Sequence, residues 1–152
     1  MVGSRLCFAV FCNFLILTRT TADALAAAES AIEAMRKVRN VIMPFPGGVV
    51  RSGSKVGSRY KTLPASTNDA FCPTLRGVVK TELPPEAGSC LEIVIDGLTA
   101  QDVRLAMRAG MDAVCRRGRE HGVIALSAGN YGGKLGQFHF PLCEIMSEGA
   151  AS

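Results

Sequence analysis

Hydrophobic and polar side chains alternate along Cys90–Gly97, and this is the clearest pattern in the chain. A period of two, in a run rich in β-branched residues that ends at a glycine, predicts a β-strand. One face of this strand carries two carboxylates, Glu92 and Asp96, together with Val94. The other face is aliphatic and suited to a hydrophobic core, with Leu91, Ile93 and Ile95.

Two other stretches have the apolar spacing of amphipathic helices. The first is expected from about residue 22 to residue 39 and the second from about residue 100 to residue 117. Each follows a capping sequence, Thr20–Asp23 and Thr99–Asp102, in which the threonine is expected to accept a hydrogen bond from the third backbone amide. The apolar stripes that predict the helices are Leu25, Ala28, Ile32 and Met35 in the first and Val103, Met107, Gly110 and Val114 in the second.

Shorter apolar runs predict further strands, at 13–18, 41–43, 49–50 and 123–126, with a last edge strand at 137–142, where Pro141 is tolerable. The order strand, helix, strand occurs twice, and each predicted helix contains an Ala-Met-Arg sequence, at 34–36 and 106–108. Two such units predict an α+β fold, a ferredoxin-like split βαβ sandwich with an antiparallel sheet and helices on one face. The other face is expected to be open, with Glu92 pointing towards it.

A chain of 152 residues predicts one domain. Residues 1–12 are not placed in the fold, residues 13–146 form the domain and residues 147–152 form a disordered tail. Arg5 followed by the apolar run 6–17 could also be a secretory signal, with Ala24–Ala26 as its cleavage site. Asn13 interrupts that run, and a helix start follows it, so a strand within the fold is the preferred interpretation.

The formal charge of +4 is modest, but its distribution is uneven. A basic segment without any acid extends from residue 36 to residue 61, and its local field favours an anionic partner. The alternative is a solvated surface. No nucleic-acid or membrane partner is expected. The basic residues of this segment are Arg36, Lys37, Arg39, Arg51, Lys55, Arg59 and Lys61.

The cysteines and histidines do not form a recognisable metal or catalytic motif. The six cysteines lack CxxC spacing, and we expect them to be reduced, as in a cytoplasmic protein. The loop around Lys55 lacks the spacing of a phosphate-binding P-loop, and no Ser–His–Asp set is recognisable. His139, between two phenylalanines, is interpreted as a strand residue that faces solvent, and a catalytic role is the less favoured alternative.

Glu92 is the stronger candidate for chemistry. If another lobe or subunit covers the open sheet face, the carboxyl group loses its hydration, and its pKa rises. A carboxyl group that is neutral near pH 7 suits proton transfer to or from an amine. The alternative is an exposed glutamate on a half-buried strand.

Residues 13–146 also resemble the formylmethanofuran:tetrahydromethanopterin formyltransferases. The stretches that carry the resemblance are PFPGG at 44–48, SGSKVGS at 52–58, ASTN at 65–68, CPTL at 72–75, EIVI at 92–95 and SAGNYGGKLG at 127–136. These stretches are long, ordered and specific. The resemblance is to one lobe only, taken to be the C-terminal, distal lobe, whereas the family has two related ferredoxin-like lobes.

The resemblance implies a cytoplasmic formyltransferase of one-carbon metabolism. Formylmethanofuran and tetrahydromethanopterin would be its co-substrates, with no bound cofactor and no metal. The implied partners are the N-terminal lobe or sister subunits, in a homo-oligomer or a formyltransferase/hydrolase complex. Glu92 is implied as the catalytic residue. The residues implied in substrate binding are Arg51, Ser52, Ser54, Lys55, Asn68, Asn130 and Lys134.

A second hypothesis is that the chain is a non-catalytic ferredoxin-like module, an assembly or regulatory subunit. It follows from the absence of the N-terminal lobe, because the active site of the family lies where lobes and subunits meet.

Overall fold

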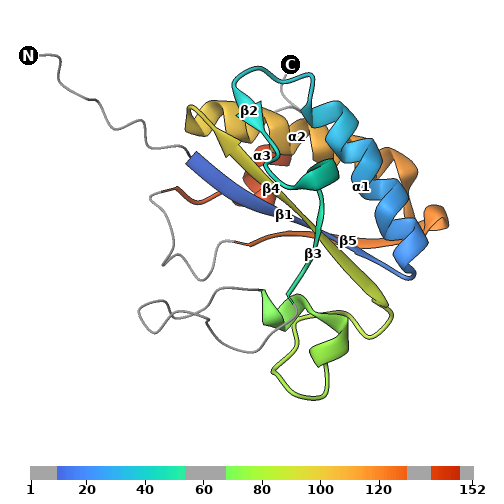
Figure 1. Cartoon of the computed structure of the whole chain (residues 1–152). Helices are drawn as coiled ribbons and strands as arrows, with labels where there is room; N and C mark the ends of the chain where they lie inside the picture. Colours follow the sequence, from blue (N-terminus) through green and yellow to red (C-terminus); the bar gives the residue numbers. More distant parts are fainter. Residues whose placement is uncertain (1–9, 54–67, 130–137, 148–152) are drawn as a thin grey trace, which may run out of the picture.

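An antiparallel sheet with two long helices across one face forms the frame of the molecule (Figure 1). The computed structural model describes residues 10–53, 68–129 and 138–147. Within them the strand order is β2-β4-β1-β5, and β3 pairs with β4 beside this path. This confirms the predicted α+β fold with helices on one face. The strands are β1 (Val10–Thr18), β2 (Val41–Ile42), β3 (Val50–Arg51), β4 (Ser89–Gly97) and β5 (Val123–Ala128), and the α-helices are α1 (Thr21–Met35), α2 (Ala100–Arg117) and α3 (Leu142–Ser147).

Both predicted helix starts are present. The Thr20 side chain accepts a hydrogen bond from the Asp23 backbone amide, and Thr99 and Asp102 form a reciprocal capping box. Helix α1 ends at Met35, before the predicted end near residue 39. The chain then turns through Asn40, whose φ of 64° is left-handed, and enters β2. Strand β1 begins at Val10, earlier than the predicted start at residue 13.

The main core lies between the sheet and the two long helices. Phe14 of β1 and Ile93 of β4 are fully buried there. Helix α1 presents alanines at positions 24, 27, 28 and 31, which are all buried and let it approach the sheet closely. Gly110 of α2 packs directly on Met35 of α1, so that a Cβ at this position would overlap the Met35 side chain.

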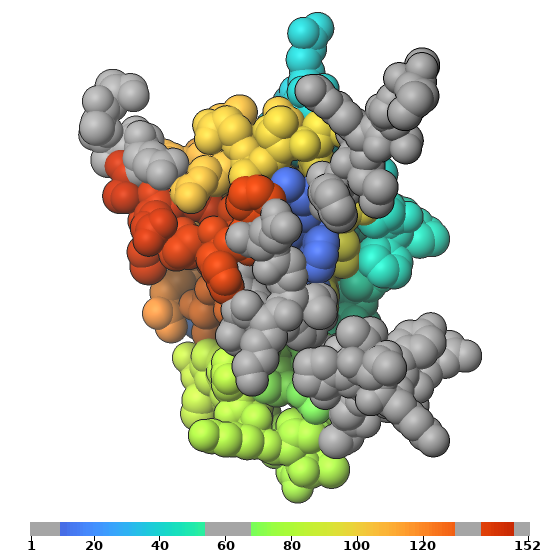
Figure 2. Space-filling view, turned by 90° about the vertical axis from the view of Figure 1, so that its left-hand side faces the viewer, coloured from blue at the N-terminus to red at the C-terminus, as the bar shows by residue number. Residues whose placement is uncertain are grey.

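The second sheet face is not open along its whole length, contrary to expectation. The segment 68–88 folds under one end of the sheet, at the bottom of Figure 1 and in green in Figure 2. Its apolar side chains form a second small core with the strands, which comprises Leu15, Leu17 and Cys90 against Phe71, Leu83 and Ala87. At the other end of this face, Phe11 and Ile42 both pair with Asp96 and remain 39% and 62% exposed.

The predicted edge strand at 137–142 is wrong. Residues 138–141 have no regular structure, Gln137 lies outside the described residues, and helix α3 begins at Leu142. The alternation around Phe140 resembles a strand, but Pro141 precedes a helical turn in which its carbonyl accepts the amides of Glu144 and Ile145.

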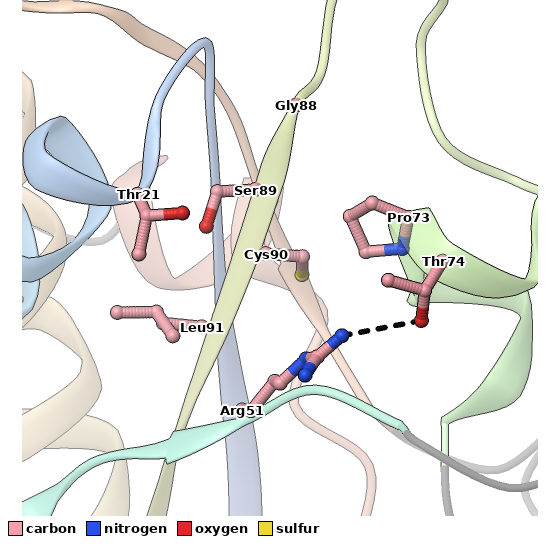
Figure 3. A pocket seen from close by; sticks show the side chains of 8 residues that line it. All are labelled: Thr21, Arg51, Pro73, Thr74, Gly88, Ser89, Cys90 and Leu91. Atoms are coloured by element: carbon pink, nitrogen blue, oxygen red, sulfur yellow. Dashed lines mark hydrogen bonds between the residues drawn. The ribbon is translucent and has the colours of Figure 1, made fainter.

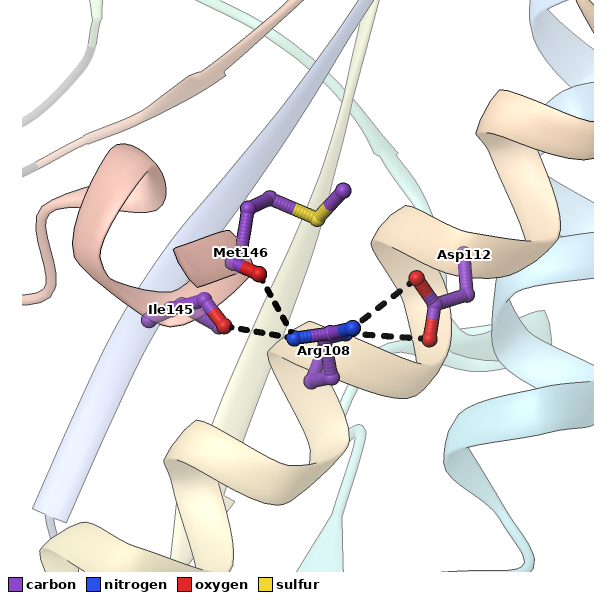
Figure 4. Close-up of polar contacts among 4 residues, drawn as sticks. All are labelled: Arg108, Asp112, Ile145 and Met146. Atoms are coloured by element: carbon purple, nitrogen blue, oxygen red, sulfur yellow. Dashed lines mark hydrogen bonds and ion pairs between the residues drawn. The ribbon is translucent and has the colours of Figure 1, made fainter. Parts of the chain in front are cut away.

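Arg108 of α2 fixes the end of helix α3 (Figure 4). Its Nη1 donates to the carbonyl oxygens of Ile145 and Met146 at 2.9 and 3.0 Å. Its Nε also pairs with the Asp112 carboxylate at 3.1 Å. A cation at the last carbonyls of a helix is favourable, so this contact explains why so short a helix stays docked. Within the described residues, no helix has the length and apolar character needed to span a membrane.

Substitution of two phenylalanines on β1, Phe14 and Phe11, tests which face of the sheet is buried in the main core. Phe14 is fully buried under the helices, whereas Phe11 is 39% exposed on the other face. We expect Phe14→Ala to lower the free energy of unfolding by about 3–5 kcal/mol, because it leaves a cavity in the core. Phe11→Ala should cost less than about 1 kcal/mol. Urea unfolding followed by circular dichroism measures both. Equal losses would contradict the assignment of the two faces.

Candidate functional site

Glu92 lies in the middle of the sheet. On β4 it stands between two neighbouring strands, opposite Leu15 of β1 and Val50 of β3. Only 6% of the residue is exposed, so the carboxyl group has left bulk water. One of its oxygens, Oε2, accepts a hydrogen bond of 3.1 Å from the side-chain amide of Asn68. A buried carboxyl group needs such a partner, and Asn68 is the one that the described residues supply.

The surroundings of Glu92 favour its neutral form. Burial raises the pKa of the Glu92 carboxyl group, and the hydrogen bond from Asn68 opposes that rise in part. Burial also raises the pKa of Asp96, which is less deeply placed on the same strand. Among these two carboxylates, Glu92 therefore combines burial, a fixed orientation and a raised pKa, the combination expected of a group that exchanges protons.

Asn68 is held in place by two glycines. Gly53 has a φ of 45° and packs so closely on the Asn68 backbone that a side chain at residue 53 would overlap it. A Cβ at Gly129 would lie 3.0 Å from Asn68 Nδ2, and the Gly129 amide donates to the Asn13 carbonyl at 2.8 Å. Residues 53, 68 and 129, which are far apart in the sequence, thus lie together beside Glu92.

Ser52 adds a buried hydroxyl group to this cluster. Its backbone amide donates to the Cys90 carbonyl at 3.2 Å, and the residue is fully buried. Its Oγ lies near the Cys90 thiol but has no hydrogen bond of standard geometry among the described residues. Burial raises the pKa of Cys90 to about 12, and that of Cys12 also to about 12. Both thiols therefore stay protonated, which argues against either as a nucleophile.

Arg51 lies close to this cluster but faces a different space. It pairs with Leu91, and its Nη2 donates to the Thr74 hydroxyl at 3.2 Å (Figure 3). There it borders a cavity of about 480 Å³ along the outer edge of β4. The structure thus brings Ser52, Asn68 and Glu92 together and places Arg51 beside them. Ser54, Lys55, Asn130 and Lys134 lie outside the described residues.

Sequence reasoning missed the residues that support Glu92. Gly53 and Gly129 occur in the Gly-rich stretches that were recognised, but nothing in the sequence alone indicated that both would pack on Asn68. His121 and His139 are exposed. Among the described residues, no group of three His, Cys, Asp or Glu side chains is arranged to hold a metal ion.

Comparison with known proteins identifies close relatives. Residues 9–145 match the family described as "FTR, proximal lobe". The chain is 67% identical over 135 residues to the formylmethanofuran–tetrahydromethanopterin formyltransferase of Methylobacillus flagellatus, which covers 89% of this chain and 45% of that protein. The enzyme of Methylococcus capsulatus is also 67% identical over 135 residues, with the same coverage.

A solved structure of a formyltransferase/hydrolase complex contains a chain with a similar fold and sequence. The formyltransferase/hydrolase complex (FhcABCD) from Methylorubrum extorquens, in complex with methylofuran, contains a chain that superposes with a TM-score of 0.80 at 52% identity. The match covers 91% of this chain and 45% of that chain. The chain therefore spans about half the length of the relatives that it matches.

The family match corrects the prediction of which lobe this chain represents. The sequence predicted the distal lobe, but the description is of the proximal lobe, so that prediction was wrong. The pattern of strands and helices could not distinguish the two, because both lobes were expected to share the ferredoxin-like arrangement. The terms describe a lobe's place in the whole enzyme.

The raised pKa of Glu92 predicts a dependence of stability on pH. Between the ordinary pKa of glutamate, about 4.3, and the higher pKa in the folded protein, the folded state keeps a proton that the unfolded state releases. Stability is therefore lost as the pH rises through this window. Glu92→Gln removes the titrating group, so from pH 4 to pH 7 its free energy of unfolding should fall less than that of the parent.

Urea unfolding at several pH values measures this difference in slope. Glu29→Gln, on the exposed surface of α1, is the matched control and should follow the parent. If parent and Glu92→Gln lose stability in parallel between pH 4 and pH 7, the buried carboxyl group is not the source of the dependence.

Proposed function

The chain belongs to the formylmethanofuran–tetrahydromethanopterin formyltransferase family, and we propose that it acts as one lobe of such an enzyme. The reaction is the transfer of a formyl group from formylmethanofuran to N5 of tetrahydromethanopterin. The observation that carries this proposal is the Glu92 carboxyl group, buried in the sheet and held by Asn68 where three parts of the chain meet.

The chemistry requires the movement of one proton. The N5 amine of the pterin attacks the formamide carbon, and the carbonyl oxygen becomes a tetrahedral oxyanion, which hydrogen-bond donors must stabilise. The attacking nitrogen loses a proton, and the methanofuran nitrogen gains one as its bond to the formyl carbon breaks. The proton count is balanced within the two substrates, so a single acid–base group can serve both halves of the reaction.

Glu92 suits this task because burial favours the protonated form, which can donate a proton. Burial disfavours the carboxylate and raises the pKa, and the Asn68 amide, which stabilises the carboxylate, opposes that rise in part. The ionised form accepts the proton of the attacking amine, and the neutral form donates it to the leaving amine. Asn68 acts as a positioning residue, which fixes one carboxyl oxygen and leaves the other for substrate.

The remaining predicted residues act in binding. Ser52 contributes a buried hydroxyl group beside Cys90, and Arg51 contributes a cation at the adjacent cavity. The acidic groups of both substrates give the basic segment around Lys55 a physical role. The residues proposed to bind substrate are Arg51, Ser52, Ser54, Lys55, Asn130 and Lys134, with no bound cofactor or metal proposed. Asn68, which the resemblance implied in substrate binding, is assigned instead to positioning Glu92.

We also propose that the chain works in an assembly in the cytoplasm. It spans 45% of its relatives, and the sheet face near Phe11 and Ile42 carries exposed apolar side chains. A protein 52% identical to it is a subunit of a formyltransferase/hydrolase complex. The other lobe of the family, sister copies in a homo-oligomer, or such a complex are the proposed partners.

Replacement of the Glu92 carboxyl group tests the proposed reaction. The chain can be grafted in place of the matching 135 residues of the Methylobacillus flagellatus enzyme, so that the rest of the protein is supplied. Glu92→Gln keeps the shape but cannot exchange the proton, and turnover should fall by about a hundredfold or more. Steady-state rates with both substrates measure it.

Asp96→Asn is the control in the same chimera. Asp96 lies on the same strand and face, and its replacement should change turnover much less. Full turnover in Glu92→Gln would remove Glu92 from the chemistry. An inactive chimera, if correctly folded, would favour the non-catalytic assembly or regulatory subunit.

Removal of one basic charge tests the role of the basic segment. Lys55→Ala in the chimera should raise KM for the acidic substrates more than it lowers kcat, because the lysine binds distant anionic groups. The loss should shrink at high salt, where such attraction is screened. An unchanged KM at low salt would exclude Lys55 from substrate binding.

A further inference from the structure

A cavity along the outer edge of β4 is separate from the Glu92 cluster. It opens beyond the end of β3, where the edge of β4 has no neighbouring strand among the described residues, and its volume is about 480 Å³. Thr21 and Ser89 line one side and Pro73 and Thr74 the other, with Arg51 at its lower end (Figure 3). The cavity therefore combines a cation, three hydroxyl groups and an apolar wall.

Ser89 is a polar side chain with no partner in this cavity. It is 6% exposed, and its hydroxyl group points from β4 towards Thr21 (Figure 3). Among the described residues its hydroxyl group makes no side-chain hydrogen bond, and its Oγ is not one of the fully buried unpaired atoms, so it is accessible from the cavity. A hydroxyl group that is unpaired and accessible from a cavity can donate to a ligand bound there.

Arg51 supplies the charge. Within the described residues, the guanidinium group makes one hydrogen bond, from Nη2 to the Thr74 hydroxyl, and no carboxylate pairs with it. The nearest acid at the start of α1 is Asp23, which is bound by the Thr20 hydroxyl and packs against Gly122 instead of lining the cavity. The guanidinium group thus retains donors for an anion.

We propose that this cavity binds an oxyanion, a carboxylate or a phosphate group carried by a ligand that extends to Glu92. Arg51 supplies the positive charge, and Ser89 and Thr21 donate from the opposite wall. The first turn of α1, which begins at Thr21, adds its partial positive charge on the same side. An oxyanion accepts from all of these donors, whereas a cation or an apolar group accepts from none.

The strand sets the distance between the two sites. Ser89 and Glu92 are three positions apart on β4, about 10 Å along the strand, and their side chains point to opposite faces. A ligand that reaches both would pass around the edge of β4 beside Cys90, which lines the cavity and lies on the same face as Glu92. A ligand of matching length could place its reactive amide or amine at Glu92 and its acidic group in the cavity. This identification of the ligand rests on the proposed function, but the binding of an oxyanion does not.

A direct binding measurement tests the site without turnover. The chain is titrated with inorganic phosphate and, separately, with glutarate at constant ionic strength, and amide chemical shifts are followed by NMR. We expect saturable shifts at Ser89 and Thr74. Arg51→Met should weaken binding tenfold or more, and Ser89→Ala about threefold, with both variants checked for folding by circular dichroism.

Arg36→Met is the matched control, because it removes the same charge from an exposed position at the end of α1. It should bind as the parent does. The proposal is overturned if the parent shows no saturable shift with either anion, or if Arg36→Met weakens binding as much as Arg51→Met does.

Steady-state kinetics of the chimera distinguish the two possible sources of the oxyanion, an acidic group of a substrate and free phosphate. If the group belongs to a substrate, Arg51→Met should raise KM with little change in kcat, and phosphate should compete with that substrate. An unchanged KM, with phosphate binding still dependent on Arg51, would assign the cavity to free phosphate and overturn the extended ligand. Loss of turnover in Glu92→Gln leaves the NMR result unaffected, so the two proposals can fail separately.

Discussion

The hydrogen bond between Asn68 and Glu92 is the contact on which the candidate site depends. A carboxyl group in the middle of a sheet loses its hydration, and the free-energy cost is large unless it is protonated or finds donors. Asn68 supplies one donor, at 3.1 Å, and its own position requires glycines at 53 and 129, where any side chain would crowd it. Burial and this amide act on the carboxyl group in opposite directions, and burial, the larger effect, raises its pKa above that of a solvated glutamate.

The sheet fixes the backbone position of Glu92, and the chain segments beside β3 supply the side chains that surround its carboxyl group. Strand β4 is held on one side by its long pairing with β1, which runs from Ser89 to Gly97, and the helices bury its aliphatic face. That rigid frame fixes the backbone at Glu92. Among the described residues, the other edge of β4 is covered only in part, by the short strands β2 and β3. The chain segments on either side of β3 can therefore approach the acid from the side, and the cavity beside Arg51 occupies the stretch of edge that they leave free.

Much of the frame could be predicted from the sequence, because it rests on local patterns. The alternation in β4, the stripe of α2 and the caps at Thr20 and Thr99 are short-range signals that are present as expected. The stripe predicted for α1 is right at Ala28, Ile32 and Met35 but wrong at Leu25, which is 46% exposed, because the buried face of α1 is formed mostly by alanines. The failures involve contacts between distant segments. The covering of the second sheet face by residues 68–88 depends on Leu83 and Ala87 meeting Leu17, which no local pattern encodes. The helix at 142–147 depends likewise on Arg108, far away in the sequence. Glu92 could be selected for its residue type and strand position. Asn68 was named only through the family resemblance, as a substrate-binding residue, and its pairing with Glu92 was not predicted.

The period of the β-strand separates the two chemical environments along β4. Cys90 and Glu92 point to the face that the segment 68–88 covers in part, whereas Ser89 and Leu91 point towards the start of α1. Residues that are neighbours in the sequence thus lie in different surroundings: Glu92 lies on one face of the sheet, and Ser89 lines the cavity at the edge of β4. A slip of one residue would exchange the two sets of side chains and bury Glu92 in the aliphatic core. The register that prevents this is set by Phe14, Ile16, Ile93 and Ile95 in that core, so the packing that stabilises the fold also determines which face carries the chemistry.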